Sequence, residues 1–171
     1  MRRPPLKAPL ARTRRVRRLA DAKRRGDPGF ADFELADSPF YLIARTAGRY
    51  AIDMDEALRA IDMDVPSWRA LMIVHHTNPS SVSEIADQAV VKLSTMTRVV
   101  QRLEKRGLVR LSRRESDARV TEVYITDRGE DAVVQVKSVA SRIYRMAFSD
   151  FTAREVAAFN DMLRRVFGNL S

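Results

Sequence analysis

Residues 81–126 hold two helical patterns followed by two strand-like runs, and this order constrains the fold more than any other part of the chain. Ser81 and Glu84 have the spacing of a capping box, which predicts that a short helix begins at Ser81. The segment 93–106 predicts a second helix, and Gly107 supplies the positive-φ residue that ends it. Its apolar residues recur at i, i+3, i+4 and i+7 and predict one buried stripe: Met96, Val99, Val100 and Leu103.

Two runs typical of β-strands, 108–111 and 120–125, come next. The residues between them, 112–119, are too charged for a core and predict a polar loop. The predicted fold class is therefore mainly α with a small β-hairpin, a winged helix-turn-helix. A helix pair followed by a basic hairpin is what a protein needs to bind a nucleic-acid duplex.

The face of the second helix opposite its apolar stripe carries groups that can donate to phosphates and base edges. These groups belong to Ser94, Thr95, Thr97, Arg98, Gln101 and Arg102. An ordinary solvated helix face is the alternative interpretation. Arg98 is the best candidate for a bidentate guanine contact, and Ser94 and Thr95, at the helix start, suit phosphate or thymine contacts.

The chain resembles the MarR family of winged helix-turn-helix transcriptional regulators. The residues that carry the resemblance are Ile85-Ala86, the helix start 94–98, the segment 103–109, the Asp117-Ala-Arg119 wing and the segment 125–129. Flanking helices in the expected order extend the match over residues 38 to 168, and residues 1 to about 33 lie outside it. The resemblance implies an obligate homodimer, made by the terminal helices, that binds a pseudo-palindromic operator in double-stranded DNA.

The segment between the two strand-like runs, the wing, is rich in arginine. Arg113, Arg114 and Arg119 are predicted to meet DNA there. By resemblance, Asp117 pairs with an arginine and stiffens the hairpin, while a wing arginine enters the minor groove. Arg119 is either that partner or the groove reader, and the sequence does not separate the two roles.

The predicted organisation has three parts. Residues 1–33 form a basic, disordered arm, residues 34–63 and 127–171 a helical dimerisation region, and residues 64–126 the DNA-binding domain. In the dimerisation region, one helix runs from Pro39 to about Ile61 and another begins after Thr126 as its N-cap. The last helix is expected to bury Val156, Phe159, Met162, Leu163, Val166 and Phe167. Helices this apolar at the ends of a small chain need another surface to cover them.

Positive charge is concentrated in the arm. Residues 1–30 hold 11 Lys and Arg against two Asp, whereas residues 31–171 hold 20 basic and 20 acidic side chains. Within that balanced part, residues 92–119 carry nine basic and three acidic side chains. The arm can be a solvated segment, or it can engage the phosphates of DNA or of an anionic ligand.

An effector is expected from the resemblance, in a pocket between the dimerisation helices and the DNA-binding lobe. Aromatic, cationic and imidazole groups facing one another there would suit a small aromatic acid or a phenol. A coenzyme A thioester of an aromatic acid is the further candidate, because the arginine-rich arm could meet its phosphates. The candidates are Tyr41, Arg45, Arg49, Trp68, Met72 and His75. Packing of the aromatic residues in a core and surface pairing of the arginines are the alternative interpretation.

Several classes of protein are excluded or disfavoured. The chain has no cysteine, its two histidines are adjacent, and it lacks a Gly-rich phosphate loop, so we expect no metal, no cofactor and no enzymatic activity. No apolar run is long enough to span a membrane, and we expect a cytoplasmic bacterial protein. The leading hypothesis is a ligand-released repressor, with activation left open. The alternative is an effector-independent architectural DNA-binding protein.

Overall fold

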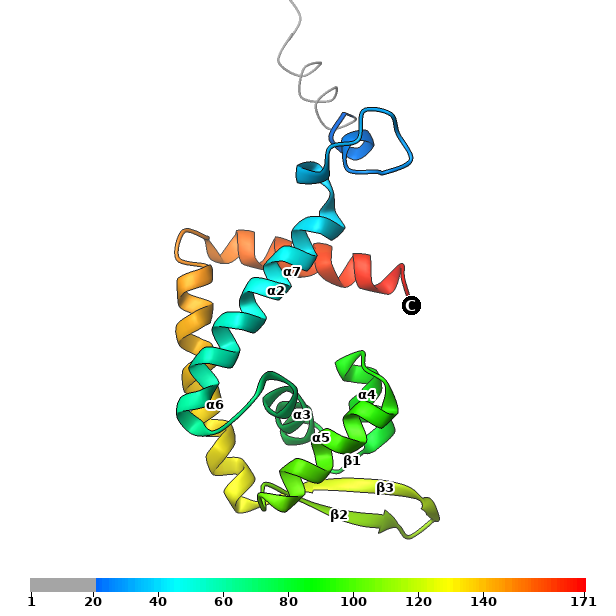
Figure 1. Ribbon diagram of the computed structural model, residues 1–171, viewed down its shortest axis with the longest axis vertical. Coiled ribbons are helices and arrows are strands. Elements are labelled where there is room, and N and C mark those ends of the chain that lie inside the picture. Colours follow the sequence, from blue (N-terminus) through cyan, green and yellow to red (C-terminus); the bar gives the residue numbers. More distant parts are fainter. Residues whose placement is uncertain (1–20) are drawn as a thin grey trace, which may run out of the picture. The chain divides into compact units, whose positions relative to one another are not determined.

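The computed structural model describes residues 21–171 and confirms the mainly helical fold class (Figure 1). The chain divides into two compact units, and the boundary lies inside one helix, between Ala51 and Ile52. The helices and strands are η1 (Leu35–Asp37), α2 (Pro39–Leu58), η2 (Arg59–Ile61), α3 (Val65–His76), β1 (Ser80–Ser81), α4 (Val82–Ala89), α5 (Leu93–Lys105), β2 (Val109–Arg114), β3 (Asp117–Ile125), α6 (Asp127–Ala147) and α7 (Ala153–Gly168).

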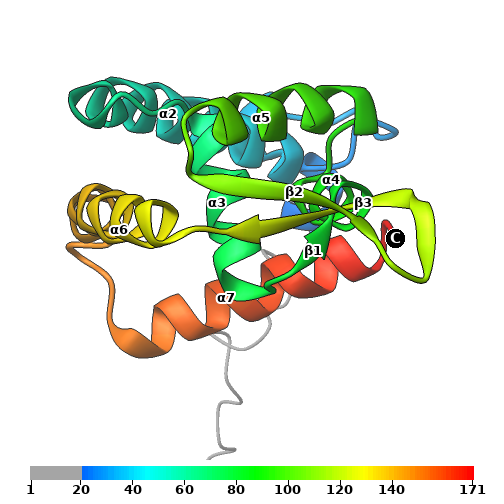
Figure 2. The same cartoon turned by 90° about the horizontal axis from the view of Figure 1, so that it is seen from below.

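The core of the second unit is built by α3, α4, α5 and the sheet. The four residues of the predicted stripe on α5 are all buried. They share this core with Leu71 and Val74 of α3, Ile85 of α4 and Val123 of β3, each of which has no exposed surface. α5 also lies alongside the hairpin of β2 and β3 (Figure 2), so the core fixes the helix and the hairpin relative to one another.

Side-chain caps mark the starts of α3, α4, α6 and α7. Ser81 and Glu84 form the predicted capping box at the start of α4. Thr126 caps α6 by accepting from the Gly129 N–H at 3.1 Å, and its own hydroxyl donates to the Gly107 carbonyl at 2.7 Å. Gly107 has a φ of 70° as predicted. Thr126 therefore ties the end of α5 to the start of α6.

The hairpin is longer than the sequence pattern predicted. Residues 112–119 were expected to form a polar loop, but β2 continues to Arg114 and β3 begins at Asp117. The sheet has the order β1-β3-β2, and β1 was not predicted. Its register places Leu111 opposite Val123, with an irregularity after Arg113. The wing is thus a two-stranded ribbon with a tight turn, which holds its side chains more firmly than a loop would.

The single chain does not bury the apolar residues of α7, because α7 has no buried residue; their predicted burial against another surface stays a prediction. Phe159 and Leu163 are each 36% exposed, and Phe167 is 59% exposed. On α2 the apolar stripe is buried only at its end, at Met54 and Leu58. These faces have the pattern of buried helices but are covered only in part; on α7, for example, the Phe159 ring lies 6.2 Å from that of Phe148 and is still 36% exposed.

Candidate nucleic-acid interface

The outer face of α5 is a continuous polar surface. Ser94, Thr95, Arg98 and Gln101 are all exposed, and they follow the spacing that places them opposite the buried stripe. Arg98 makes no ion pair or side-chain hydrogen bond with any residue in the described range 21–171. A guanidinium without a protein partner keeps all of its donors for another molecule.

Two other predicted contact residues of α5 already have partners. The Thr97 hydroxyl donates to the Leu93 carbonyl at 2.9 Å. Arg102 lies on the flank of the helix nearest the start of α3, where its Nη2 is 3.0 Å from Asp64 Oδ2. Of the six candidates on α5, Thr97 and Arg102 have side-chain partners among the described residues, although Arg102 is exposed, and the other four are exposed without one.

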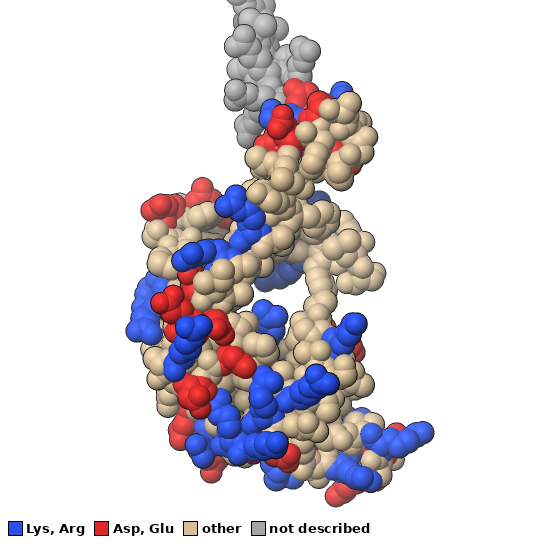
Figure 3. Space-filling view, in the orientation of Figure 1, with Lys and Arg blue, Asp and Glu red and all other residues tan. Residues whose placement is uncertain are grey.

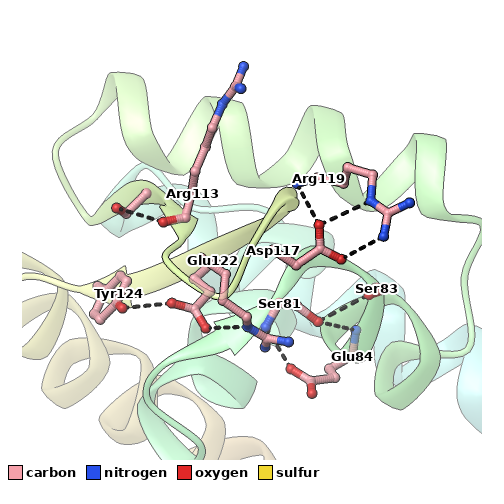
Figure 4. A network of polar contacts seen from close by, with 10 residues as sticks. Ser81, Ser83, Glu84, Arg113, Asp117, Arg119, Glu122 and Tyr124 are labelled. Carbon is pink, nitrogen blue, oxygen red and sulfur yellow. Dashed lines mark hydrogen bonds and ion pairs between the residues drawn. The ribbon is translucent and has the colours of Figure 1, made fainter.

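The tip of the wing is fixed by a pair between Asp117 and Arg119. Arg119 Nε lies 3.0 Å from Asp117 Oδ1 and Nη2 lies 3.2 Å from Oδ2, and the Arg119 backbone N–H also donates to Oδ1 (Figure 4). The hydrogen bonds from the Arg119 side chain and backbone lower the pKa of Asp117 below its ordinary value. Arg119 is thus the partner of Asp117, yet its side chain is 91% exposed and can still meet an anion.

A second network braces the body of the hairpin, and the sequence did not predict it. Arg114 Nε lies 2.7 Å from Glu122 Oε1, while the Tyr124 hydroxyl donates to Glu122 Oε2 at 2.8 Å. Arg110 lies over the Tyr124 ring at 4.3 Å. Hydrogen bonding from Arg114, and then from Tyr124, lowers the pKa of Glu122. Arg114 therefore stiffens the hairpin, whereas sequence alone grouped it with the exposed arginines.

Arg113 differs from its neighbour because alternate residues of a strand point to opposite faces. Its guanidinium extends away from the Glu122 network (Figure 4), and its side chain is exposed. Lys and Arg side chains gather over α5 and toward the tip of the hairpin (Figure 3). Among the wing arginines, Arg113 and Arg119 are the two that face solvent.

A groove of about 310 Å³ lies between the recognition helix α5 and the wing. Thr97 and Gln101 line it from the helix, and Arg119 and Thr121 line it from β3. Glu104 of α5 binds the edge of β2, where its Oε1 accepts a hydrogen bond from the Leu111 N–H at 3.3 Å. This hydrogen bond fixes the spacing between the helix and the hairpin.

The candidate effector residues fall in both units. In the first unit, Arg45 lies 5.6 Å from the ring centre of Tyr41, one helical turn away. In the second, Trp68, Met72 and His75 share one face of α3 and are half-buried. The indole N–H of Trp68 is buried and has no hydrogen-bond partner among the described residues.

His75 joins α3 to α6. Its Nδ1 lies 2.8 Å from Glu130 Oε2, and its Nε2 lies 2.9 Å from Lys137 Nζ. Arg49 lies on the exposed surface of α2, on the same helix as Tyr41. Within residues 21–171, no group of His, Asp or Glu could hold a metal ion, and no helix is long and apolar enough to cross a membrane. Most of the predicted basic arm, residues 1–20, lies outside the described range.

A helix pair whose second member exposes a polar, cationic face beside a braced basic hairpin defines a winged helix-turn-helix DNA-binding protein. The chain matches the MarR family over residues 63–121. It is also 40% identical over 144 residues to the HTH-type transcriptional repressor IacR of Pseudomonas putida, which covers 84% of this chain and 86% of that protein. The chain therefore belongs to the MarR family of transcriptional regulators.

Solved structures share the fold. A MarR-family transcriptional regulator from Silicibacter pomeroyi is 25% identical, with a TM-score of 0.75 over 83% of this chain and 96% of that one. A structure of BpsR from Bordetella bronchiseptica, which concerns regulation of its DNA binding by 6-hydroxynicotinic acid, has a TM-score of 0.67. It is 20% identical and covers 74% of this chain and 96% of that one. The IacR repressor and the Silicibacter pomeroyi protein are transcriptional regulators and not enzymes, which agrees with the prediction for this chain.

Proposed function

We propose that this protein is a homodimeric repressor that binds a pseudo-palindromic operator and is released from it by a small anionic aromatic ligand. The observation that carries the proposal is the exposed outer face of α5, where Arg98 has no partner among the described residues. The similarity to the IacR repressor over most of both chains supports repression as the regulatory outcome.

The contacts with DNA are assigned by exposure. Arg98 reads a guanine edge in the major groove, because its guanidinium can donate to both guanine acceptors, O6 and N7. Ser94 and Thr95, in the first turn of α5, contact phosphates or thymine. Arg113 enters the minor groove, with Arg119 beside it, while Asp117 keeps the wing rigid. Arg114 contributes through Glu122 and not by touching DNA.

A second copy of the chain covers the exposed apolar residues of α7. Met162 is 55% exposed and Val166 is 36% exposed, in addition to Phe159, Leu163 and Phe167. A stripe of this kind is larger than the isolated apolar residues of ordinary surfaces. A two-fold dimer then presents two α5 helices about 34 Å apart, one turn of duplex.

The effector is an aromatic acid, a phenol or a coenzyme A thioester of such an acid. Tyr41, Arg45 and Arg49 of α2, together with Trp68, Met72 and His75 of α3, remain the candidate binding residues. The BpsR structure, which concerns an aromatic acid, supports this class of ligand. The unpartnered Trp68 N–H supports it as well, because a buried donor without an acceptor is costly unless a ligand accepts from it.

Release of the protein from DNA follows if the ligand binds the two geometries of the dimer with different affinities. A ligand that binds more tightly to a dimer geometry unable to span both half-sites weakens DNA binding by the ratio of its affinities for the two geometries. His75 contacts Glu130 and Lys137 of α6, so a ligand against α3 can act on the helix that Thr126 connects to α5.

The test is DNA binding to the promoter region beside the protein's own gene, across a salt series, with a panel of aromatic acids and their coenzyme A thioesters. The proposal expects sequence-selective binding that one compound releases. Binding that ignores both sequence and every compound would instead identify an effector-independent architectural protein, with a steep salt dependence and a small specificity ratio.

A further inference from the structure

Asp64 uses its two carboxylate oxygens for different purposes. Oδ1 accepts from the Ser67 N–H at 2.7 Å and caps α3. Oδ2 lies 3.0 Å from Arg102 Nη2, on the recognition helix 38 residues away. A cap needs only one oxygen, and asparagine would provide it equally well. The negative charge of Asp64 is therefore not required for the helix start.

A second aspartate forms a similar ion pair one turn further along, with Arg106 at the C-cap of α5. Arg106 Nη2 lies 3.2 Å from Asp62 Oδ2, and Arg106 Nη1 contacts the Met63 sulfur at 3.8 Å. Asp62 has a φ of 52°, and its side chain is 97% exposed. This left-handed conformation is uncommon for residues other than glycine, although Asp adopts it more readily than most. The short joint between η2 and α3 thus directs two carboxylates at one flank of α5.

The two faces of α5 consequently differ in charge. On the outer face, Arg98 and Lys105 have no acidic partner among the described residues. On the flank, Arg102 and Arg106 are each matched by an aspartate. Both pairs border a cavity of about 350 Å³. The cations on the outer face, where base edges would be read, are therefore unpaired within residues 21–171, whereas those on the neighbouring flank are neutralised by the two aspartates.

We infer that Asp62 and Asp64 are specificity residues that act through Arg102 and Arg106, by withholding these arginines from the phosphates of non-cognate DNA. The inference rests on the proposed DNA-binding function. Phosphate contacts strengthen binding to every sequence alike, so each free arginine on the flank would favour the wrong sites as much as the right one. The ratio of cognate to non-cognate affinity rises when contacts that non-cognate DNA could also make are removed.

The effect on the cognate site is smaller, because base contacts of the outer face fix how α5 lies in the groove. A non-cognate complex has no such constraint, and its phosphates can approach the flank. Both pairs are exposed ion pairs, which are individually weak. The expected change in non-cognate affinity is therefore about two- to fivefold for each aspartate.

The decisive variant is Asp64→Asn, which keeps the cap of α3 and removes the charge. Its binding is measured across a salt series on two duplexes, one selected from a random pool by the wild-type protein and one scrambled. Scrambled-duplex affinity should rise about two- to fivefold. The log–log salt slope on that duplex should steepen by about 0.9, the value for one more neutralised phosphate. Affinity for the selected duplex should rise less, so that the specificity ratio falls.

Arg102→Gln separates the pair from a general charge effect. In the wild-type background it removes one positive charge and leaves Asp64 without its partner, so scrambled binding should weaken and not strengthen. In the Asp64→Asn background it should abolish the gain. Asp131→Asn adds the same charge on exposed α6 and serves as the control. An unchanged scrambled affinity, an equal rise in the control, or weaker binding of Asp64→Asn to the selected duplex would each overturn the inference.

Failure of the proposed function would give a different result from failure of the inference about the aspartates. If the wild-type protein binds the selected and scrambled duplexes equally, it is not a sequence-specific regulator, whatever the aspartate variants do. Thermal unfolding of Asp64→Asn should match the wild type, which shows that the α3 cap is intact. A variant of matching stability with a reduced specificity ratio supports the positioning role.

Discussion

Gly129, in the first turn of α6, permits a close backbone approach that no other residue would allow. Its N–H donates to the Thr126 hydroxyl at 3.1 Å, and a Cβ at this position would lie 2.1 Å from the Leu108 carbonyl oxygen. The same Cβ would lie 2.7 Å from Ile125 Cγ1. The Leu108 carbonyl also accepts from the Thr126 N–H at 3.2 Å, so it cannot move away without loosening the start of α6.

Because of these distances, replacing Gly129 by alanine should lower the stability of the protein, whereas the same change in a helix usually raises it. In an unconstrained helix, Gly→Ala stabilises a protein by about 1 kcal/mol. At Gly129 the new carbon would sit 2.1 Å from an oxygen, where ordinary contact begins at 3.4 Å. Overpacking of this kind costs about 1–3 kcal/mol, and a backbone neighbour favours the upper end. We expect Gly129→Ala to destabilise the protein by about 2 kcal/mol after the gain in helix propensity is subtracted.

The measurement is urea unfolding followed by circular dichroism, at a fixed protomer concentration because self-association would add to the apparent stability. Gly48→Ala is the matched control, since a Cβ at this position of α2 meets nothing within 4 Å. It should be neutral or stabilising by about 0.5–1 kcal/mol. If Gly129→Ala proved as stable as the wild type, the close packing of α6 against the start of β2 would be refuted.

Three further predictions concern the interface, the wing and the dimer. Arg98→Ala should weaken operator binding by about 1–3 kcal/mol in fluorescence anisotropy without altering self-association, and unchanged affinity would remove Arg98 from the reading set. Because Arg119 lowers the pKa of Asp117, their pairing holds at neutral pH and is lost as pH falls through that lowered pKa. Arg119→Ala should raise the pKa of Asp117 toward its ordinary value in a carboxyl NMR titration, and no change would contradict the pairing. Leu163→Glu should give monomers in sedimentation equilibrium, whereas Val134→Glu on α6 should not; a dimeric Leu163→Glu protein would exclude α7 from the interface.

Local signals in the sequence predicted most of the second unit. The capping box of Ser81, the N-cap of Thr126 and the positive φ of Gly107 depend on residues close in the chain. The buried stripe of α5 follows from helical periodicity alone. Such features can be predicted from sequence because the partners of each group lie within a few residues of it.

The features that were missed depend on register or on distant partners. The outer ends of the two wing strands, residues 112–114 and 117–119, hold no buried residue, so they lack the apolar alternation by which strands are identified. Arg113 and Arg114 are adjacent and chemically identical, and only the register opposite β3 makes one of them a partner of Glu122. The pairing of Arg102 with Asp64 joins residues 38 positions apart, and nothing in the local sequence indicates it.

The terminal helix α7 has strong local helix signals but little packing within the chain. α7 has a complete capping box, with the Glu155 carboxylate accepting from the Thr152 N–H at 2.9 Å, yet none of its 16 residues is buried. Capping contributes only about 1 kcal/mol, and isolated helices of this length are marginal in water. Helical stability in proteins comes mainly from packing an apolar face, and the apolar face of α7 is exposed within the chain. We therefore expect α7 to be stabilised by a surface outside the single chain, such as the second copy of the proposed dimer. The sequence pattern indicates the same need, because an apolar stripe on a terminal helix of so small a chain predicts that another surface covers it.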